Sequence, residues 1–167
     1  MRFLPLIVFG LLLAAAAALV SVLSAGLPEL VAVHFNVAGV ANGFMTREDC
    51  HSFMLTFTLG APAFVAVVTG LTPRVLPASM INIPNRAYWL AAERADESIA
   101  FLSEQGIWFS CILLIFLAYV DWMLARANES SPPGFPSRHF VWAMAAFAFA
   151  IAFWAMRMLR RFRVPPR

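Results

Sequence analysis

The sequence predicts an all-α polytopic membrane protein: four transmembrane helices, an ordered extracytoplasmic loop and a short interfacial segment. Hydrophobic residues make up 62% of the chain, above the roughly 45–50% of soluble domains. Four long stretches are nearly free of charge, and each approaches the ~20 residues that cross a bilayer. We expect a single membrane domain, 1–167, with spans at about 3–26, 50–71, 99–125 and 139–158.

The first apolar stretch, Phe3–Ala25, contains no charged residue. A cleaved signal peptide is the alternative interpretation of such an N-terminal segment. Its apolar part is longer than the usual core of about 7–15 residues, and no clean Ala-x-Ala cleavage site follows. We therefore expect an uncleaved first helix.

The first loop, 27–49, carries most of the distinctive polar residues. Val31–Asn36 is rich in β-branched and aromatic residues, which favours a short extended segment. Gly39 and the pair Asn42-Gly43 are turn signals, and Asn-Gly predicts a tight turn. Thr46 and the acidic residues after it predict the N-cap of the second helix.

The second loop contains the motif Asn82, Pro84, Asn85, Tyr88 and Trp89. Asn85 has the side chain of a helix cap, so we expect a short helix from the next residue. The aromatic pair is typical of headgroup depth. We expect this segment to lie along the membrane interface.

Polar residues mark the edges of the third span. Glu104 and Asp121 are about 25 Å apart along a helix, so each falls near one interface. An ionisable residue that faces the bundle would instead be a site candidate. Asn128 follows the span at its exit.

Arginine counting predicts the orientation, because cytoplasmic loops carry the excess of basic residues. Nine arginines fall on one side of the domain and three on the other. The first side holds Arg2, Arg74, Arg86, Arg94, Arg157, Arg160, Arg161, Arg163 and Arg167, and the second holds Arg47, Arg126 and Arg138. Both termini are therefore expected in the cytoplasm, with the first loop outside. The net charge of +3 reflects the basic tail, and no nucleic-acid motif is present.

The outer side also holds the residue types that bind transition metals, namely His34, Asp49, Cys50, His51 and Asp121. No two of them have a tight ligand spacing such as H-x-x-x-H or C-x-x-C. The favoured interpretation is that His34 and Asn36 hydrogen-bond the backbone of their own loop. We expect no metal, no cofactor and no catalytic residue.

Two motifs resemble a known family. The first is met by Pro28, Val33, His34, Phe35, Asn36, Gly39, Asn42, Gly43 and Phe44, and the second by Asn82, Pro84, Asn85, Tyr88, Trp89 and Leu90. With a weaker match at Arg126-Ala127-Asn128, they resemble the bacterial domain of unknown function 1648 family over about 28–128. That family is related to the membrane domain of immunity proteins against the sporulation-delaying toxin, which protect the producing cell and hold a repressor at the membrane.

The resemblance implies a non-catalytic protein of the immunity or sensing type in the bacterial cytoplasmic membrane. Its outer loop, His34–Phe44, would bind a secreted peptide, a toxin or another protein. The interfacial motif would brace the inner side or dock a cytoplasmic regulator. One alternative is a structural subunit associated with other membrane proteins in a larger complex. A second is a metal-dependent enzyme or carrier that uses His34 and Asp121.

Overall fold

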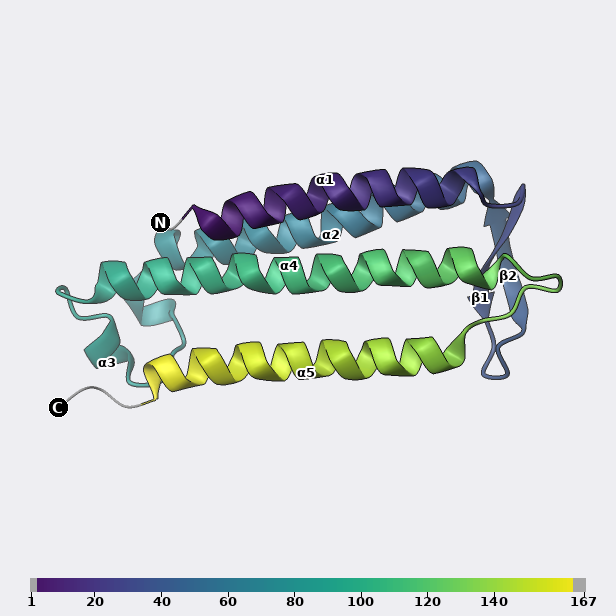
Figure 1. Ribbon diagram of the computed structural model, residues 1–167. Coiled ribbons are helices and arrows are strands. Elements are labelled where there is room, and N and C mark those ends of the chain that lie inside the picture. The colour runs from purple at the N-terminus through teal and green to yellow at the C-terminus, as the bar shows by residue number, and fades with distance from the viewer. Residues whose placement is uncertain (1–2, 164–167) are drawn as a thin grey trace.

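Four long helices dominate the chain, whose computed structural model describes residues 3–163 (Figure 1). They are α1 (Leu4–Ala25), α2 (Arg47–Val75), α4 (Ala95–Ala127) and α5 (Ser137–Phe162). Each is long and apolar enough to cross a membrane. The prediction of four potential spans is thus confirmed; Arg2 and Arg167, used in the arginine count, lie outside the described residues.

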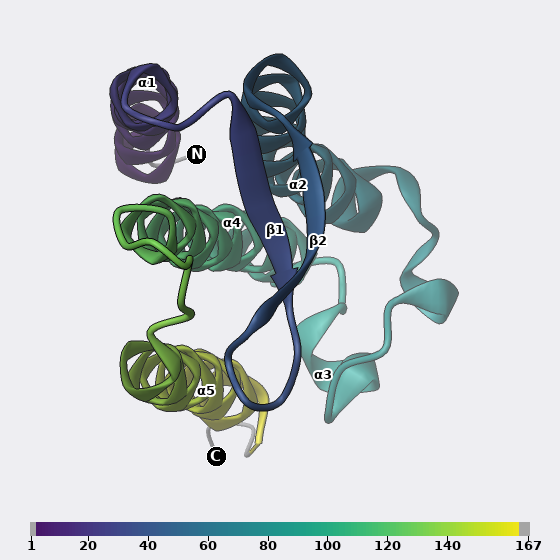
Figure 2. The same ribbon diagram turned by 90° about the vertical axis from the view of Figure 1, so that its right-hand side faces the viewer.

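The helix α4 is the centre of the bundle. It packs against α1, α2 and α5, and its most extensive contact is with α2. Figure 2 views the bundle along its axis, with α1 and α2 on one side of α4 and α5 on the other. The helix α5 therefore lies at the margin, and its main packing partner is α4.

The first loop folds into a β-hairpin, which corrects the all-α prediction. Strand β1 (Leu30–Phe35) pairs antiparallel with β2 (Ala41–Thr46). The hairpin lies across one end of the bundle (Figures 1 and 2). We call this end the hairpin end. The β-branched and aromatic residues of β1 indicated an extended segment, but the second strand carried no comparable signal.

The prediction of a tight turn at Asn42-Gly43 is wrong, because both residues lie within β2. The chain reverses instead at 36–40, where Asn36 Oδ1 accepts from the backbone N–H groups of Ala38 and Val40, each at 3.0 Å. Gly43 instead allows the two strands to approach closely beside His34. The ladder is irregular beside His34, and a Cβ on Gly43 would stand only 2.8 Å from the Cβ of His34.

The predicted cap of the second helix is confirmed. Thr46 Oγ1 accepts from the N–H of Asp49 at 3.1 Å and donates to its carboxylate at 2.7 Å. Because this cap satisfies donors in the first turn, α2 begins at Arg47, before the apolar stretch itself.

The opposite end, where α1 begins and α5 ends, holds the second loop (Figure 1). This loop contains the short helices η1 (Ala78–Met80) and α3 (Arg86–Trp89). Seven described arginines lie in this loop or in the ends of the helices that meet there. They are Arg74, Arg86, Arg94, Arg157, Arg160, Arg161 and Arg163. We call this end the arginine end.

Candidate functional site: the hairpin and the two ends of the bundle

One amide side chain joins the middle of the hairpin to the bundle. Asn128, the C-cap residue of α4, accepts from the N–H of Ala32 at 2.8 Å and donates to the carbonyl of Ala32 at 2.9 Å. Its amide nitrogen also lies 2.9 Å from the carbonyl of Leu124. A single side chain thus satisfies both main-chain groups of one β1 residue and joins them to the last turn of α4.

The turn of the hairpin is held from the α5 side. The loop before α5 forms an isolated bridge between Gly134 and Val40, and the N–H of Phe135 donates to Gly39 at 3.1 Å. The rings of Phe35 and Phe135 lie 5.3 Å apart. At the base, the N–H of Arg47 donates to Glu29 at 3.0 Å. The hairpin is therefore anchored at its base, its middle and its turn.

The bonds of Asn128, read with the pairing register, show which edge of the hairpin is open. Directly opposed residues in an antiparallel pair either bond each other or both point outward. Ala32 opposes Phe44, and both main-chain groups of Ala32 are bonded to Asn128. The N–H and carbonyl of Phe44 therefore point away from β1. The sheet has only two strands in the described part of the chain, so this edge of β2 is unpaired.

The face of the hairpin that looks away from the bundle combines apolar and polar groups. His34 Nδ1 donates to Asn42 Oδ1 on this exposed face, so the expectation that His34 bonds backbone is wrong. Phe44 lies beside this pair and Leu30 lies nearer the base of the hairpin, and they are 50% and 61% exposed. Val37 in the turn is fully exposed. The polar pair fixes the ring of His34 on this face.

The sequence motif thus serves mostly to shape and anchor the hairpin. Pro28 accepts from Arg47 Nε at 3.4 Å at the base. Asn36 closes the turn through two backbone bonds, and Gly39 sits within it with φ +77°. No local sequence pattern indicates the contact between Asn128 and Ala32, although both lie within the stretch that carries the resemblance.

Asp121 is buried between α2 and α4. Its side chain is 7% exposed, and it accepts a 2.6 Å hydrogen bond from Thr58 Oγ1. Of the two positions considered from the sequence, this is the one that faces the bundle. Glu104, on the same helix towards the arginine end, is half-buried and takes part in an interaction of its own.

The structure does not bring the candidate metal ligands together. His34 is exposed on the hairpin, whereas Asp121 is buried against Thr58. Cys50 is buried, and its thiol donates to Met54 Sδ at 3.7 Å within the apolar cluster below the hairpin. Within residues 3–163, no group of three or more His, Cys, Asp or Glu side chains is arranged to hold a metal ion.

At the arginine end, the interfacial motif braces α5. Asn85 is the N-cap residue of α3, which begins at Arg86 as the sequence predicts, but its side chain makes no capping bond and its backbone has φ 53°. Its amide instead donates to the carbonyls of Phe162 and Arg163, at 2.8 and 2.6 Å. The side chain of Asn85 therefore caps a helix end, but that end is the C-terminus of α5. Asn82 and Pro84 are exposed.

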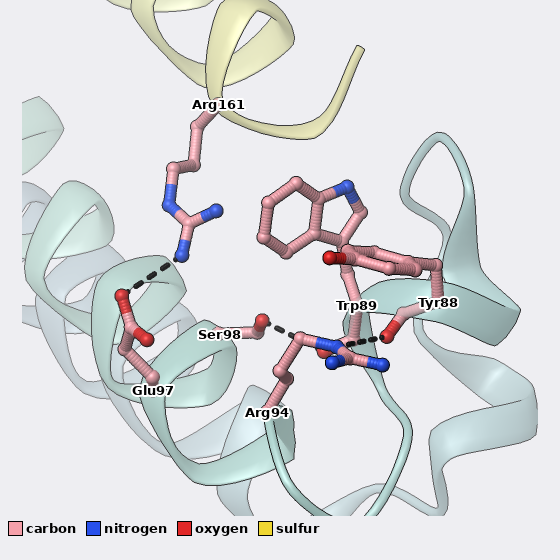
Figure 3. A network of polar contacts seen from close by, with 6 residues as sticks. All are labelled: Tyr88, Trp89, Arg94, Glu97, Ser98 and Arg161. Carbon is pink, nitrogen blue, oxygen red and sulfur yellow. Dashed lines mark hydrogen bonds and ion pairs between the residues drawn. The ribbon is translucent and has the colours of Figure 1, made fainter. Parts of the chain in front are cut away.

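Aromatic and charged side chains complete this brace (Figure 3). The guanidinium of Arg161 lies 4.1 Å from the ring centroid of Trp89 and 2.9 Å from Glu97. Tyr88 is covered by Arg94 at 4.0 Å, and Ser98 donates to the carbonyl of Trp89 at 2.8 Å. The sequence indicated aromatic residues at the interface, but it did not identify Arg161 as their partner. Trp89 and Arg161 lie in different elements far apart in the sequence, so no local pattern indicates their pairing.

Comparisons with protein-family models, with curated proteins and with solved structures find no match for this chain. The resemblance of the two loop motifs therefore stays a prediction.

Proposed function

We propose that the chain is a non-catalytic, multi-pass membrane protein that binds an extended peptide at the open edge of its hairpin, in the manner of an immunity or sensing protein. The observation that carries this proposal is the arrangement at Ala32. Asn128 occupies the free edge of β1 at this residue, whereas the main-chain groups of the opposing Phe44 point outward from the edge of β2.

An unpaired strand edge is a template for another strand, and peptides commonly bind by adding to one. Main-chain bonds supply affinity in this mode, while side chains beside the edge supply specificity. Here Leu30 and Phe44 offer exposed apolar surface, and the His34–Asn42 pair offers a polar group beyond Phe44, towards the turn. The three anchors of the hairpin reduce the ordering that a ligand would otherwise have to impose.

The arginine distribution supports an outward-facing hairpin in the bacterial cytoplasmic membrane. Seven described arginines gather at the opposite end, whereas the hairpin end has Arg47, Arg126 and Arg138. With both termini in the cytoplasm, the hairpin meets secreted peptides or toxins. The brace around Trp89 then lies inside, where it supports α5 and offers a surface to a cytoplasmic regulator.

The first test identifies the ligand in intact cells. A photo-crosslinking phenylalanine analogue replaces Phe44, and the control carries it at Phe149, which is 75% exposed on α5. We expect an adduct with a secreted peptide at position 44 alone, identified by mass spectrometry. Adducts with a fixed set of membrane subunits at both positions would instead identify a structural subunit of a larger complex.

The second test uses the identified peptide and separates main-chain from side-chain recognition. Phe44→Pro removes the outward N–H, and proline is tolerated where a strand N–H faces solvent. Phe44→Ala keeps that N–H and removes the ring. Strand addition predicts that Phe44→Pro weakens binding beyond Phe44→Ala by about 0.5–1.5 kcal/mol, the usual net value of one hydrogen bond. Equal affinities of the two variants would contradict binding at this edge.

A further inference from the structure

A groove runs along the outer surface of the bundle between α1, α4 and α5. Its volume is about 430 Å³, within the roughly 300–1,000 Å³ of small-molecule sites. Its lining is apolar except at one end. Val8 and Leu12 of α1 form one wall, Trp108 and Ile112 of α4 form the floor, and Trp154 of α5 forms the other wall.

The walls of the groove are held in place. Trp154 Nε1 donates to the backbone carbonyl of Gln105 at 2.9 Å, which fixes the indole across the seam between α5 and α4. The ring of Phe109 lies 5.0 Å from the same indole. Because the seam is fixed by these contacts, the groove is present before anything occupies it.

The length of the groove matches one leaflet. Its floor on α4 extends from Gln105 to Ile115, or about 15 Å at 1.5 Å per residue. A hydrocarbon core of about 30 Å gives each leaflet about half that depth. An acyl chain that enters from the arginine end would therefore lie within the groove and end near the middle of the bilayer.

The charge at the mouth favours an anionic headgroup. Arg157 lines the groove and is exposed, and no ion pair joins it to a carboxylate within the described residues. Arg161, one turn later, is by contrast committed to Glu97 and Trp89. Glu104 lies near this mouth but already takes part in an interaction. A long arginine side chain reaches headgroup level from within a span.

We propose that this groove binds one anionic phospholipid, with an acyl chain between α1, α4 and α5 and the phosphate at Arg157. A helix of a second copy would fill an apolar seam equally well, but it gives no reason for a cation at the mouth. Basic pockets between transmembrane helices are general sites for anionic headgroups. This site is independent of the hairpin and of any peptide.

Native mass spectrometry of the purified protein tests the proposal with phosphatidylglycerol and phosphatidylcholine of identical acyl chains. We expect one phosphatidylglycerol to bind about fivefold more tightly than phosphatidylcholine, as one basic contact provides. Arg157→Gln should reduce this ratio to about one. The matched control is Arg163→Gln, which removes an exposed arginine at the same helix end but outside the groove, and it should keep the ratio.

A third variant tests the acyl-chain part. Ile112→Trp fills the groove and should weaken binding of both lipids severalfold while the protein stays monodisperse. Unchanged lipid binding in Ile112→Trp would overturn the proposal. Equal losses of the phosphatidylglycerol preference in Arg157→Gln and Arg163→Gln would also overturn it, because they would show that the arginines act through their general positive charge and not through a site in the groove. A stable dimer that excludes lipid from the groove would assign it to a second copy and equally overturn the lipid site.

Discussion

At the scale of single residues, the hairpin end depends on side chains that bond to backbone. Asn128 replaces a missing strand beside Ala32, and Asn36 replaces backbone partners within the turn. Buried or half-buried main-chain groups without a partner cost free energy. Asn36 therefore stabilises the turn of a short two-stranded hairpin, which is marginal by itself, and Asn128 helps to hold that hairpin on the bundle.

Asn128 provides a graded test of this role. Asn128→Leu removes both bonds to Ala32, whereas Asn128→Asp keeps the acceptor for the Ala32 N–H and loses the donors. We expect faster hydrogen exchange of the Ala32 amide in both variants, with docking weakened by about 1–3 kcal/mol in Asn128→Leu and less in Asn128→Asp. Exchange rates equal to wild type in Asn128→Leu would show that the hairpin stays docked without it.

At the scale of elements, the contact between α2 and α4 is the main seam of the bundle. Membrane helices gain little from the hydrophobic effect in lipid, so they associate through small residues and close packing. Gly106 of α4 lies against Thr69 of α2, and a Cβ there would stand 2.6 Å from the Thr69 Cβ. The buried pair Thr58–Asp121 adds a hydrogen bond to the same seam.

Gly106→Ala should weaken this seam, because the added methyl cannot fit without moving α2. We expect a loss of about 1–3 kcal/mol in the free energy of unfolding, the usual range for overpacking, measured by titration with a denaturing detergent. Gly60→Ala is the matched control, since nothing lies within 4 Å of a Cβ at Gly60. A similar loss in both variants would mean that backbone flexibility, not the close approach, explains the effect.

At the scale of the whole molecule, the two ends of the bundle differ in chemistry. One end carries an anchored hairpin with exposed apolar side chains, and the other carries seven described arginines and the brace around Trp89. The anionic cytoplasmic face of a bilayer attracts the arginine-rich end more strongly than the hairpin end. The whole chain is therefore expected to have one orientation, with the hairpin outside.

Cysteine labelling of intact cells tests this orientation. The background is Cys50→Ala with Cys111→Ala, which removes the two free, buried thiols. Val40→Cys in the turn of the hairpin should react with a membrane-impermeant maleimide in intact cells, and Ala78→Cys at the arginine end should react only after permeabilisation. The reverse pattern would invert the proposed topology and place the peptide site in the cytoplasm.

The sequence by itself determined the four apolar helices, because length and the absence of charge are local properties that any bilayer-spanning segment must have. It also determined the cap at Thr46, which acts on residues of its own first turn. Only the tertiary structure decided the rest of the candidate sites. The bond of Asn128 to Ala32, the capping of α5 by Asn85 and the burial of Asp121 against Thr58 join residues far apart in the chain. Such partners depend on how helices pack, and packing is a property of the assembled bundle that no local pattern carries.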